Sequence, residues 1–248
     1  MAVAEEGSNG AFERARGRRL LSSDVELVIV ADANEVAPVV ADWLAGAARK
    51  GGHIALTGGT TPELAYKEAA QREPEWSKTE LWWSDERCVP PDDDLSNYAL
   101  AKRTLIDRLE RDPRTVHRIM GELGREEAAA AYELELGDTV FDLELLGMGK
   151  DGHVASLFPN APTLQQSKRV LPAEPGLEPF VDRVTLSIAA LNSAREIVFA
   201  LSGAEKAEAA RRAFAATPSP DTPASLVRAH DGRTIAILDR AAAARLGA

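Results

Sequence analysis

The chain of 248 residues contains a single cysteine, Cys88. An internal disulfide is therefore excluded, and such sparse cysteine is typical of proteins in a reducing compartment. No apolar run approaches the roughly 20 residues that a membrane-spanning helix needs. The arginines near the N-terminus are not followed by the apolar segment of a secretory signal. We therefore predict a cytoplasmic protein with no membrane partner.

Basic residues are the minority among the charged ones: 29 Lys and Arg stand against 39 Asp and Glu, for a net charge of −10. Binding to nucleic acid depends on basic surfaces that neutralise phosphates, so this composition argues against a nucleic-acid partner. An anionic small molecule would need a locally positive pocket within an unfavourable overall field. The chain has no HExxH or CxxC motif, and its four histidines are scattered. We therefore expect no metal and no cofactor.

Apolar runs of strand length alternate with helical spacing along most of the chain. This alternation predicts an α/β fold: a single domain with a mainly parallel sheet and helices on both faces. Strands are expected at 27–31, 53–57, 80–83, 115–119, 141–146, 183–187, 196–201 and 234–238. Residues 1–20 lack periodicity and are expected to form a disordered or loosely attached leader, followed by one domain at 21–248. We expect a monomer or a weak homo-oligomer.

The segments between these strands carry weaker signals. Val154–Phe158 is expected to form one helical turn, Leu171–Pro179 a loop, and Arg240–Leu246 a closing helix. The spacing of apolar residues after Asp32 predicts a helix that this aspartate, or the asparagine two positions on, can cap. His117 lies within a weak strand, so we expect it to be packed rather than catalytic.

The segment 141–159 carries the strongest chemical signal. Its apolar run ends in a glycine-rich turn at 147–149, and open α/β sheets bind ligands outside the carboxyl ends of their strands. His153 follows, with Asp151 two positions before it. Histidine exchanges a proton near neutral pH, and an acidic neighbour can orient its ring. An isolated Asp-Gly-His would be better explained by a turn with a capping aspartate and a solvated histidine.

A second candidate is the sequence Gly58-Gly59-Thr60-Thr61-Pro62, which connects a strand to a helix. Glycines, threonine hydroxyls and free N–H groups at a helix N-terminus together form a phosphate cradle. Pro62 suits the first helical turn, and Thr60 or Thr61 can cap it. The lysine of a Walker loop and the spacing of a dinucleotide fingerprint are absent, which argues against ATP and NAD sites. By itself the segment fits a phosphate site and a plain turn about equally.

Charged side chains near two further strand ends are also candidates. Asp85 and Arg87 follow the strand expected at 80–83. The arginine fork suits phosphate or carboxylate, and Asp85 can hold a sugar hydroxyl or orient the arginine. Lys206 lies in the first turn of a helix that Gly203 opens, which is unfavourable for an ammonium group unless an anion is bound nearby. A surface Asp–Arg pair and a helix-surface lysine are the commoner explanations.

Three strings agree in order and spacing with a known family: LTGGTTP, WWSDERCVPPDDDLSNY and LGMGKDGHVASLFP. With LSGAEKA near the C-terminus, they resemble the motifs of the 6-phosphogluconolactonases, in the family that also holds the glucosamine-6-phosphate isomerases. The resemblance covers residues 24–246, and several ordered motifs are far more specific than one. It implies a modified Rossmann-like fold and the hydrolysis of 6-phospho-D-glucono-1,5-lactone to 6-phosphogluconate in the oxidative pentose phosphate pathway. The implied partner is a small phosphorylated sugar lactone.

The resemblance also implies a role for each matched residue. His153, oriented by Asp151, would deprotonate the attacking water, and N–H groups of the glycine-rich loop would stabilise the oxyanion. Arg87, Lys206 and the Gly58–Thr61 turn would hold the phosphate. The substrate-binding residues that it implies are Gly58, Gly59, Thr60, Thr61, Asp85, Arg87 and Lys206.

Two alternatives compete with a lactonase. The isomerases of the same family carry a glutamate five residues after the histidine, used in ring opening, where this chain has Phe158, and a tyrosine at the place of Arg87. We therefore expect no ammonia release from glucosamine 6-phosphate. A non-catalytic sugar-phosphate-binding regulator would need an output module, but no helix-turn-helix or basic face is apparent. The presence of both Asp151 and His153 also argues against a regulator.

Overall fold

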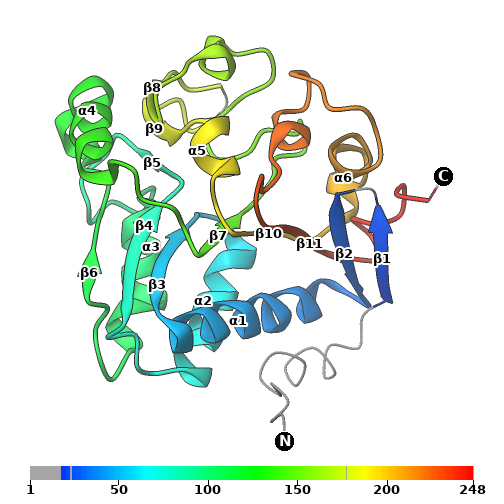
Figure 1. The fold of residues 1–248 in the computed structure, drawn as a ribbon, viewed down its shortest axis with the longest axis horizontal. Coiled ribbons are helices and arrows are strands. Elements are labelled where there is room, and N and C mark those ends of the chain that lie inside the picture. The colour runs from blue at the N-terminus through cyan, green and yellow to red at the C-terminus, as the bar shows by residue number, and fades with distance from the viewer. Residues whose placement is uncertain (1–17, 23, 177, 248) are drawn as a thin grey trace, which may run out of the picture.

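A computed structural model describes residues 18–22, 24–176 and 178–247. Its main sheet is built from β1 (Arg18–Ser22), β2 (Val25–Val30), β3 (Gly52–Leu56), β4 (Thr79–Trp83), β6 (Thr115–Val116), β7 (Leu143–Leu146), β10 (Glu196–Leu201) and β11 (Arg233–Asp239). In the described part of the chain these strands follow the order β1-β2-β11-β10-β7-β3-β4-β6 (Figure 1). Only the pairing of β1 with β2 is antiparallel. The predicted mainly parallel sheet is confirmed.

Helices cover both faces of this sheet. They are α1 (Ala33–Lys50), α2 (Thr60–Arg72), α3 (Asn97–Thr104), α4 (Arg125–Leu136), α5 (Ile188–Asn192) and α6 (Ala207–Phe214). Figure 1 shows α1 and α2 on one side of the sheet and α4, α5 and α6 on the other. Right-handed crossovers explain this division, because the chain first winds from β2 toward the β6 edge and then returns toward β11. None of the helices in the described residues has the length and apolar composition needed to cross a bilayer.

Helix α1 shows how the sequence specifies these elements. Val36, Val40 and Leu44 recur at helical spacing and are fully buried in the core. The Asp32 side chain caps the helix by accepting a hydrogen bond of 2.8 Å from the backbone N–H of Asn34. The predicted aspartate cap is therefore confirmed.

A second, smaller sheet contains β5 (Asp85–Arg87), β9 (Arg183–Leu186) and β8 (Val170–Ala173), all antiparallel and in the order β5-β9-β8. The expectation that 183–187 joins the parallel sheet was wrong. The expected loop at Leu171–Pro179 was also wrong in part, because β8 occupies its first three residues. Short strands of an inserted antiparallel sheet carry no periodicity that separates them from strands of the main sheet. Helix α4 packs against β8 and β9.

Three other expectations need correction. Val154–Phe158 is not helical: Val154 and Leu157 form an antiparallel bridge, and the φ of 49° at Ala155 lies in the left-handed region, which breaks a helix. The chain after β11 forms turns rather than the closing helix expected at Arg240–Leu246. Arg18–Leu20, assigned to the leader, belong to β1, while residues 1–17 of that leader lie outside the described residues.

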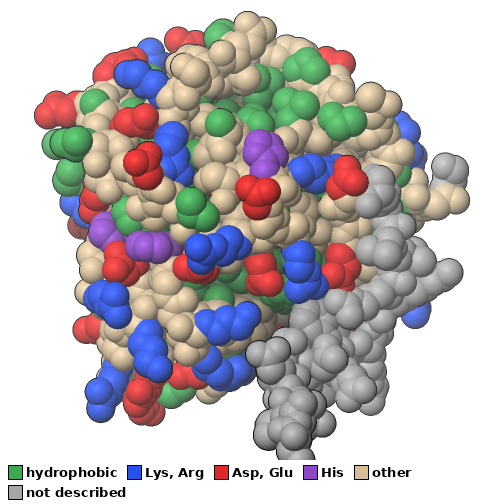
Figure 2. All heavy atoms as spheres, in the orientation of Figure 1, with side chains coloured by type: hydrophobic (Ala, Val, Ile, Leu, Met, Phe, Trp, Pro, Cys, Tyr) green, Lys and Arg blue, Asp and Glu red, His purple; other side chains and the backbone are tan. Residues whose placement is uncertain are grey.

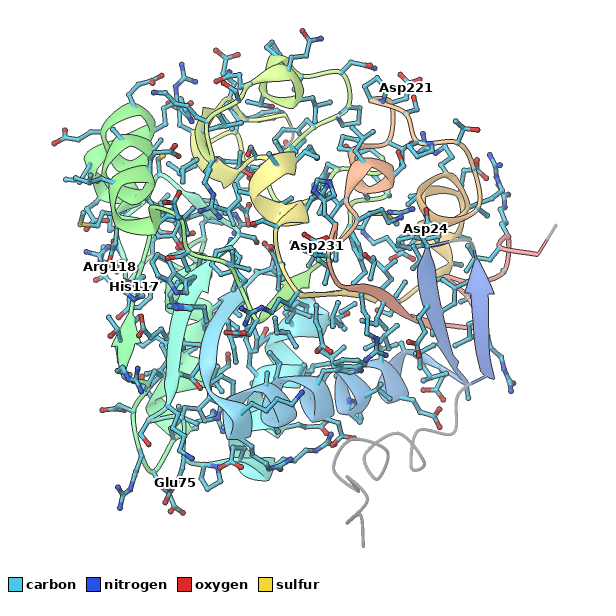
Figure 3. All side chains as sticks on the ribbon, in the orientation of Figure 1. Asp24, Glu75, His117, Arg118, Asp221 and Asp231 are labelled. Carbon is cyan, nitrogen blue, oxygen red and sulfur yellow. The ribbon has the colours of Figure 1, made fainter. Side chains whose placement is uncertain are left out.

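His117 is packed, as expected. Its ring stacks on Trp82 with the ring centroids 3.8 Å apart. Its Nδ1 lies 2.6 Å from a carboxylate oxygen of Glu135 and its Nε2 lies 3.0 Å from one of Glu80. Figure 3 shows His117 beside Arg118 at the edge of the molecule, close to β6 and α4. These contacts give the histidine a structural role at the sheet edge.

One buried carboxyl group stands out in the core. Glu144 lies in the central strand β7, where its Cα pairs with those of Ile197 and Ala55. The residue is fully buried, and neither carboxyl oxygen has a hydrogen-bond partner among the described residues. Burial raises the pKa of Glu144 well above its usual value of 4.5, and the charge of Arg169 only partly opposes this. Folding therefore favours the neutral form of this carboxyl group.

We predict that Glu144→Gln removes a pH-dependent loss of stability. A carboxyl group whose pKa is raised by folding stabilises fully below its unfolded pKa and loses that contribution as the pH rises toward its folded pKa. Above pH 4.5 the wild type should lose about 1.4 kcal/mol of unfolding free energy per pH unit through this group. The variant, whose amide does not titrate, should not show this loss. Urea denaturation between pH 4 and 8 measures the difference. Glu127→Gln, on the exposed surface of α4, is the control. If the unfolding free energies of Glu144→Gln and the wild type differ by the same amount at every pH, the pKa of Glu144 is not raised by folding.

Candidate active site

Four neighbouring parallel strands of the main sheet, β10, β7, β3 and β4, have their carboxyl ends on the same side of the sheet. The loops that follow them, with the start of β9, line an open cavity of about 390 Å³. Nearly all predicted site residues line it: Gly58, Gly59, Thr60, Thr61, Asp85, Arg87, His153 and Lys206. Asp151 does not line the cavity, but lies in contact with the ring of His153. The structure therefore brings the predicted residues together.

His153 and Asp151 form a hydrogen-bonded pair in the loop after β7. The Nδ1 of His153 lies 2.7 Å from Oδ1 of Asp151, which also accepts the backbone N–H of His153 at 3.2 Å. Burial would raise the pKa of Asp151, but its hydrogen bond and charge interaction with His153 lower it to about 2. The aspartate is thus an acceptor at neutral pH, so it holds the proton of His153 on Nδ1. This arrangement leaves the lone pair on Nε2, which suits a general base.

Glycine at position 149 lets this pair form. The N–H of Gly149 donates to the carbonyl of His153 at 2.9 Å, and the N–H of Gly152 donates to the carbonyl of Gly149 at 3.0 Å. These bonds fold the loop tightly on itself. A Cβ at position 149 would lie 2.0 Å from Nδ1 of His153 and 2.3 Å from Oδ1 of Asp151. Only glycine leaves room for the two side chains to meet.

The turn after β3 presents backbone N–H groups to the cavity. The hydroxyl of Tyr66 fixes the strand end, since it donates to the carbonyl of Thr57 at 2.7 Å and accepts its N–H at 3.0 Å. Helix α2 is capped by Gly59, with a φ of 118°, so the predicted capping by Thr60 or Thr61 was wrong. With no side chain capping the helix, its first N–H groups remain available to an anion.

Asp85 is held from two sides. It is buried, and its Oδ2 accepts from the hydroxyl of Ser156 at 2.7 Å while its Oδ1 accepts from the amide of Asn97 at 3.1 Å. No ion pair joins Asp85 to Arg87 among the described residues. Instead, the guanidinium of Arg87 donates to the carbonyl of Leu95 at 2.5 Å. The suggestion that Asp85 orients this arginine therefore has no contact to support it.

Three cations line the cavity: Arg87, Arg183 and Lys206. Across the face shown in Figure 2, basic side chains are interspersed with acidic ones. The three cavity cations, by contrast, form no salt bridge within the described part of the chain. Burial lowers the pKa values of both Lys206 and Arg183, and the charge of Arg87 lowers that of Arg183 further. Partly desolvated, unpaired cations in one cavity favour a bound anion.

Arg183 is the site residue that the sequence analysis missed. It lies at the start of a strand, and in a parallel sheet that position faces the edge opposite to the binding site. Because β9 runs antiparallel to β5, Arg183 instead pairs with Arg87 in register and reaches the cavity. Its guanidinium lies 5.8 Å from the ring of Phe158. No signal in the sequence reveals the direction of β9.

The described residues contain no group of three His, Cys, Asp or Glu side chains arranged to hold a metal ion. The charged and titratable groups that line the cavity are His153, the three cations and the carboxylates of Asp85 and Glu205, while Asp151 contacts the His153 ring from outside the lining. Such a set can bind an anion at one place and move a proton at another.

The fold and this site define an α/β protein with a cation-lined cavity beside a histidine–aspartate pair. Over residues 26–236 the chain matches the family model for glucosamine-6-phosphate isomerases/6-phosphogluconolactonase. The chain belongs to this family. The fold and family that the sequence motifs implied are thus confirmed.

Individual relatives agree with the family match. The chain is 38% identical over 216 residues to 6-phosphogluconolactonase of Mycobacterium tuberculosis, covering 81% of this chain and 87% of that one. It is 34% identical over 243 residues to 6-phosphogluconolactonase of Streptomyces coelicolor, covering 90% and 92%. The solved structure of 6-phosphogluconolactonase from Thermotoga maritima superposes with a TM-score of 0.76 at 30% identity, covering 87% of this chain and 99% of that one.

We predict that Gly149→Ala separates His153 from Asp151. Without its hydrogen bond to the histidine, the Asp151 carboxyl should lose the depression of its pKa to about 2 and titrate at a higher pH. Carboxyl ¹³C NMR at acidic pH measures this change. Gly147→Ala is the matched control, because a Cβ there meets nothing within 4 Å. An unchanged Asp151 titration in Gly149→Ala would show that the pair does not depend on this glycine.

Proposed function

We propose that this cavity binds 6-phospho-D-glucono-1,5-lactone and hydrolyses it to 6-phosphogluconate. The observation that carries the proposal is the pairing of His153 with an ionised Asp151 in a cavity that also holds three unpaired cations. A phosphorylated lactone needs both features, since its phosphate needs cations and its ester carbonyl needs an activated water. The names of the relatives support the same reaction.

His153 acts as the general base in this scheme. Its Nε2 takes a proton from water while the water oxygen bonds to the lactone carbonyl carbon, which gives a tetrahedral intermediate. The bond from that carbon to the ring oxygen then breaks, and the ring oxygen receives the proton from Nε2. Asp151 keeps the other proton on Nδ1 and stabilises the transient imidazolium. The product acid finally ionises, so each turnover releases one proton into solution.

The phosphate is held at a distance from this chemistry. Arg87 and Arg183, which are cross-strand partners, supply planar donor forks, and Lys206 supplies a compact charge from the end of β10. The first N–H groups of α2, beyond Gly59, add uncharged donors. Binding at this end positions the carbonyl beside Nε2 of His153, which is how contacts remote from the reacting atoms raise the rate.

Phe158 supports the lactonase over the isomerase activity of the same family. Its ring centroid lies 5.1 Å from that of His153, and the residue is only 7% exposed. It occupies the place where a carboxylate would be expected in an isomerase. An apolar ring beside the base excludes water from one side of the imidazole and offers no acid for ring opening.

The base is tested by His153→Ala. The variant should lose roughly a hundred- to ten-thousand-fold in kcat, the usual contribution of a positioned general base, with little change in KM. The assay is proton release from freshly generated phosphorylated lactone. His230→Ala, in a loop outside the cavity, should keep the wild-type rate. Near wild-type kcat in His153→Ala would remove this histidine from the mechanism.

The anion site is tested by Arg87→Ala, Arg183→Ala and Lys206→Ala. Each should lower kcat/KM for the phosphorylated lactone by a factor that corresponds to a loss of about 1–3 kcal/mol in transition-state stabilisation. This is the range of a charge-assisted hydrogen bond. The control is the substrate: hydrolysis of unphosphorylated glucono-1,5-lactone, which lacks the group these cations hold, should scarcely change. Equal losses on both lactones would mean that the cations serve catalysis or folding instead of phosphate binding.

A further inference from the structure

Arg212 approaches the histidine–aspartate pair from outside the cavity. It lies on α6, and its Nη2 donates a hydrogen bond of 3.1 Å to the backbone carbonyl of Asp151. Its Nε is buried without a hydrogen-bond partner, and the residue forms no salt bridge among the described residues. It is not among the residues that line the cavity. A partly buried guanidinium is costly to desolvate, and the hydrogen bond that Arg212 donates goes to the loop carbonyl, while its charge also helps to lower the pKa of Asp221.

The outer side of the same loop has few other supports. The N–H of Ala224 donates to the carbonyl of Gly152 at 3.0 Å. Gly152, with a φ of 95°, lies so close to Thr222 that an added Cβ would meet its methyl group at 2.7 Å. The segment that carries these residues includes Asp221, which Figure 3 places near the end of the molecule that carries α6. Backbone contacts and Arg212 therefore support the loop on the side that faces away from the cavity.

The position of Arg212 along α6 links the two ends of the site. Helix α6 begins directly after Lys206, one of the cavity cations. Arg212 lies within α6, six residues after Lys206, and contacts Asp151. The N-cap residue of α6 thus lines the cavity as a cation, and Arg212 within the helix donates to the backbone of the aspartate. Helix α6 therefore connects Lys206 to the backbone of Asp151.

We propose that Arg212 is a positioning residue that holds Asp151, and through it the ring of His153, at a fixed distance from the anion site. The proposal rests on the function proposed above. Misplacement of a reacting group by about 1 Å can cost a hundredfold in rate. Loss of the Arg212 contact therefore lowers kcat, whereas the cavity cations, which bind the phosphate, are left in place and KM changes little.

The kinetic test compares Arg212→Gln and Arg212→Lys with Arg211→Gln, using proton release from the phosphorylated lactone. Arg211 is the matched control, because it lies next on the same helix but pairs with Glu208 at 2.7 Å. Arg212→Gln should lower kcat roughly tenfold to a hundredfold with KM within about threefold of wild type. Arg212→Lys, which keeps a charged donor, should recover part of the loss, and Arg211→Gln should match the wild type. An unchanged kcat in Arg212→Gln, or a loss of kcat matched by an equal rise in KM, overturns the proposal.

A second measurement does not depend on the reaction. Amide hydrogen exchange at 150–153 should be faster in Arg212→Gln than in the wild type, while exchange in α1 stays the same. Equal exchange in the loop overturns the proposal even if activity falls. If the wild-type protein does not hydrolyse the lactone, the proposed function fails, yet faster exchange at these amides would still support Arg212 as the support of the loop.

Discussion

The meeting of four parallel strand ends at one edge is the constraint on which the site depends. Because β10, β7, β3 and β4 are parallel neighbours in the sheet, the loops that follow them lie next to one another. Each loop contributes a different capability: a turn with free N–H groups, a buried aspartate, a histidine–aspartate pair and a lysine at the start of a helix. The small antiparallel sheet adds the arginine pair, and with it the cavity is enclosed.

Electrostatics explains how a chain with a net charge of −10 can bind an anion. The overall field opposes the approach of a phosphate, so affinity must come from the local cavity. There, Arg87, Arg183 and Lys206 form no salt bridge among the described residues. Burial lowers the pKa values of the last two, and the charges of nearby carboxylates only partly oppose this. A phosphate that pairs with them would offset the cost of desolvating these cations. Because these cations form no salt bridge, the proposed site would favour ligands that carry a negative charge.

Much of this architecture could be predicted from the sequence, and the failures share a cause. The parallel strands, the aspartate cap of α1 and the residues that meet in the cavity follow from local spacing and from ordered motifs. The turn at Val154–Phe158, the direction of β9 and the reach of Arg183 and Arg212 depend on contacts between distant segments. Periodicity reports which side of an element is buried. It does not report strand direction in a short inserted sheet, or which backbone carbonyl a long side chain meets.

The proposed mechanism and the proposed role of Arg212 both depend on the opening of a phosphorylated lactone in this cavity. The most direct test follows proton release, at constant pH, from freshly generated 6-phospho-D-glucono-1,5-lactone with and without the protein. The account predicts that catalytic amounts of protein release one proton per lactone far faster than buffer alone, and that inorganic phosphate competes. A rate no faster than the spontaneous reaction, measured with folded protein, would contradict the account.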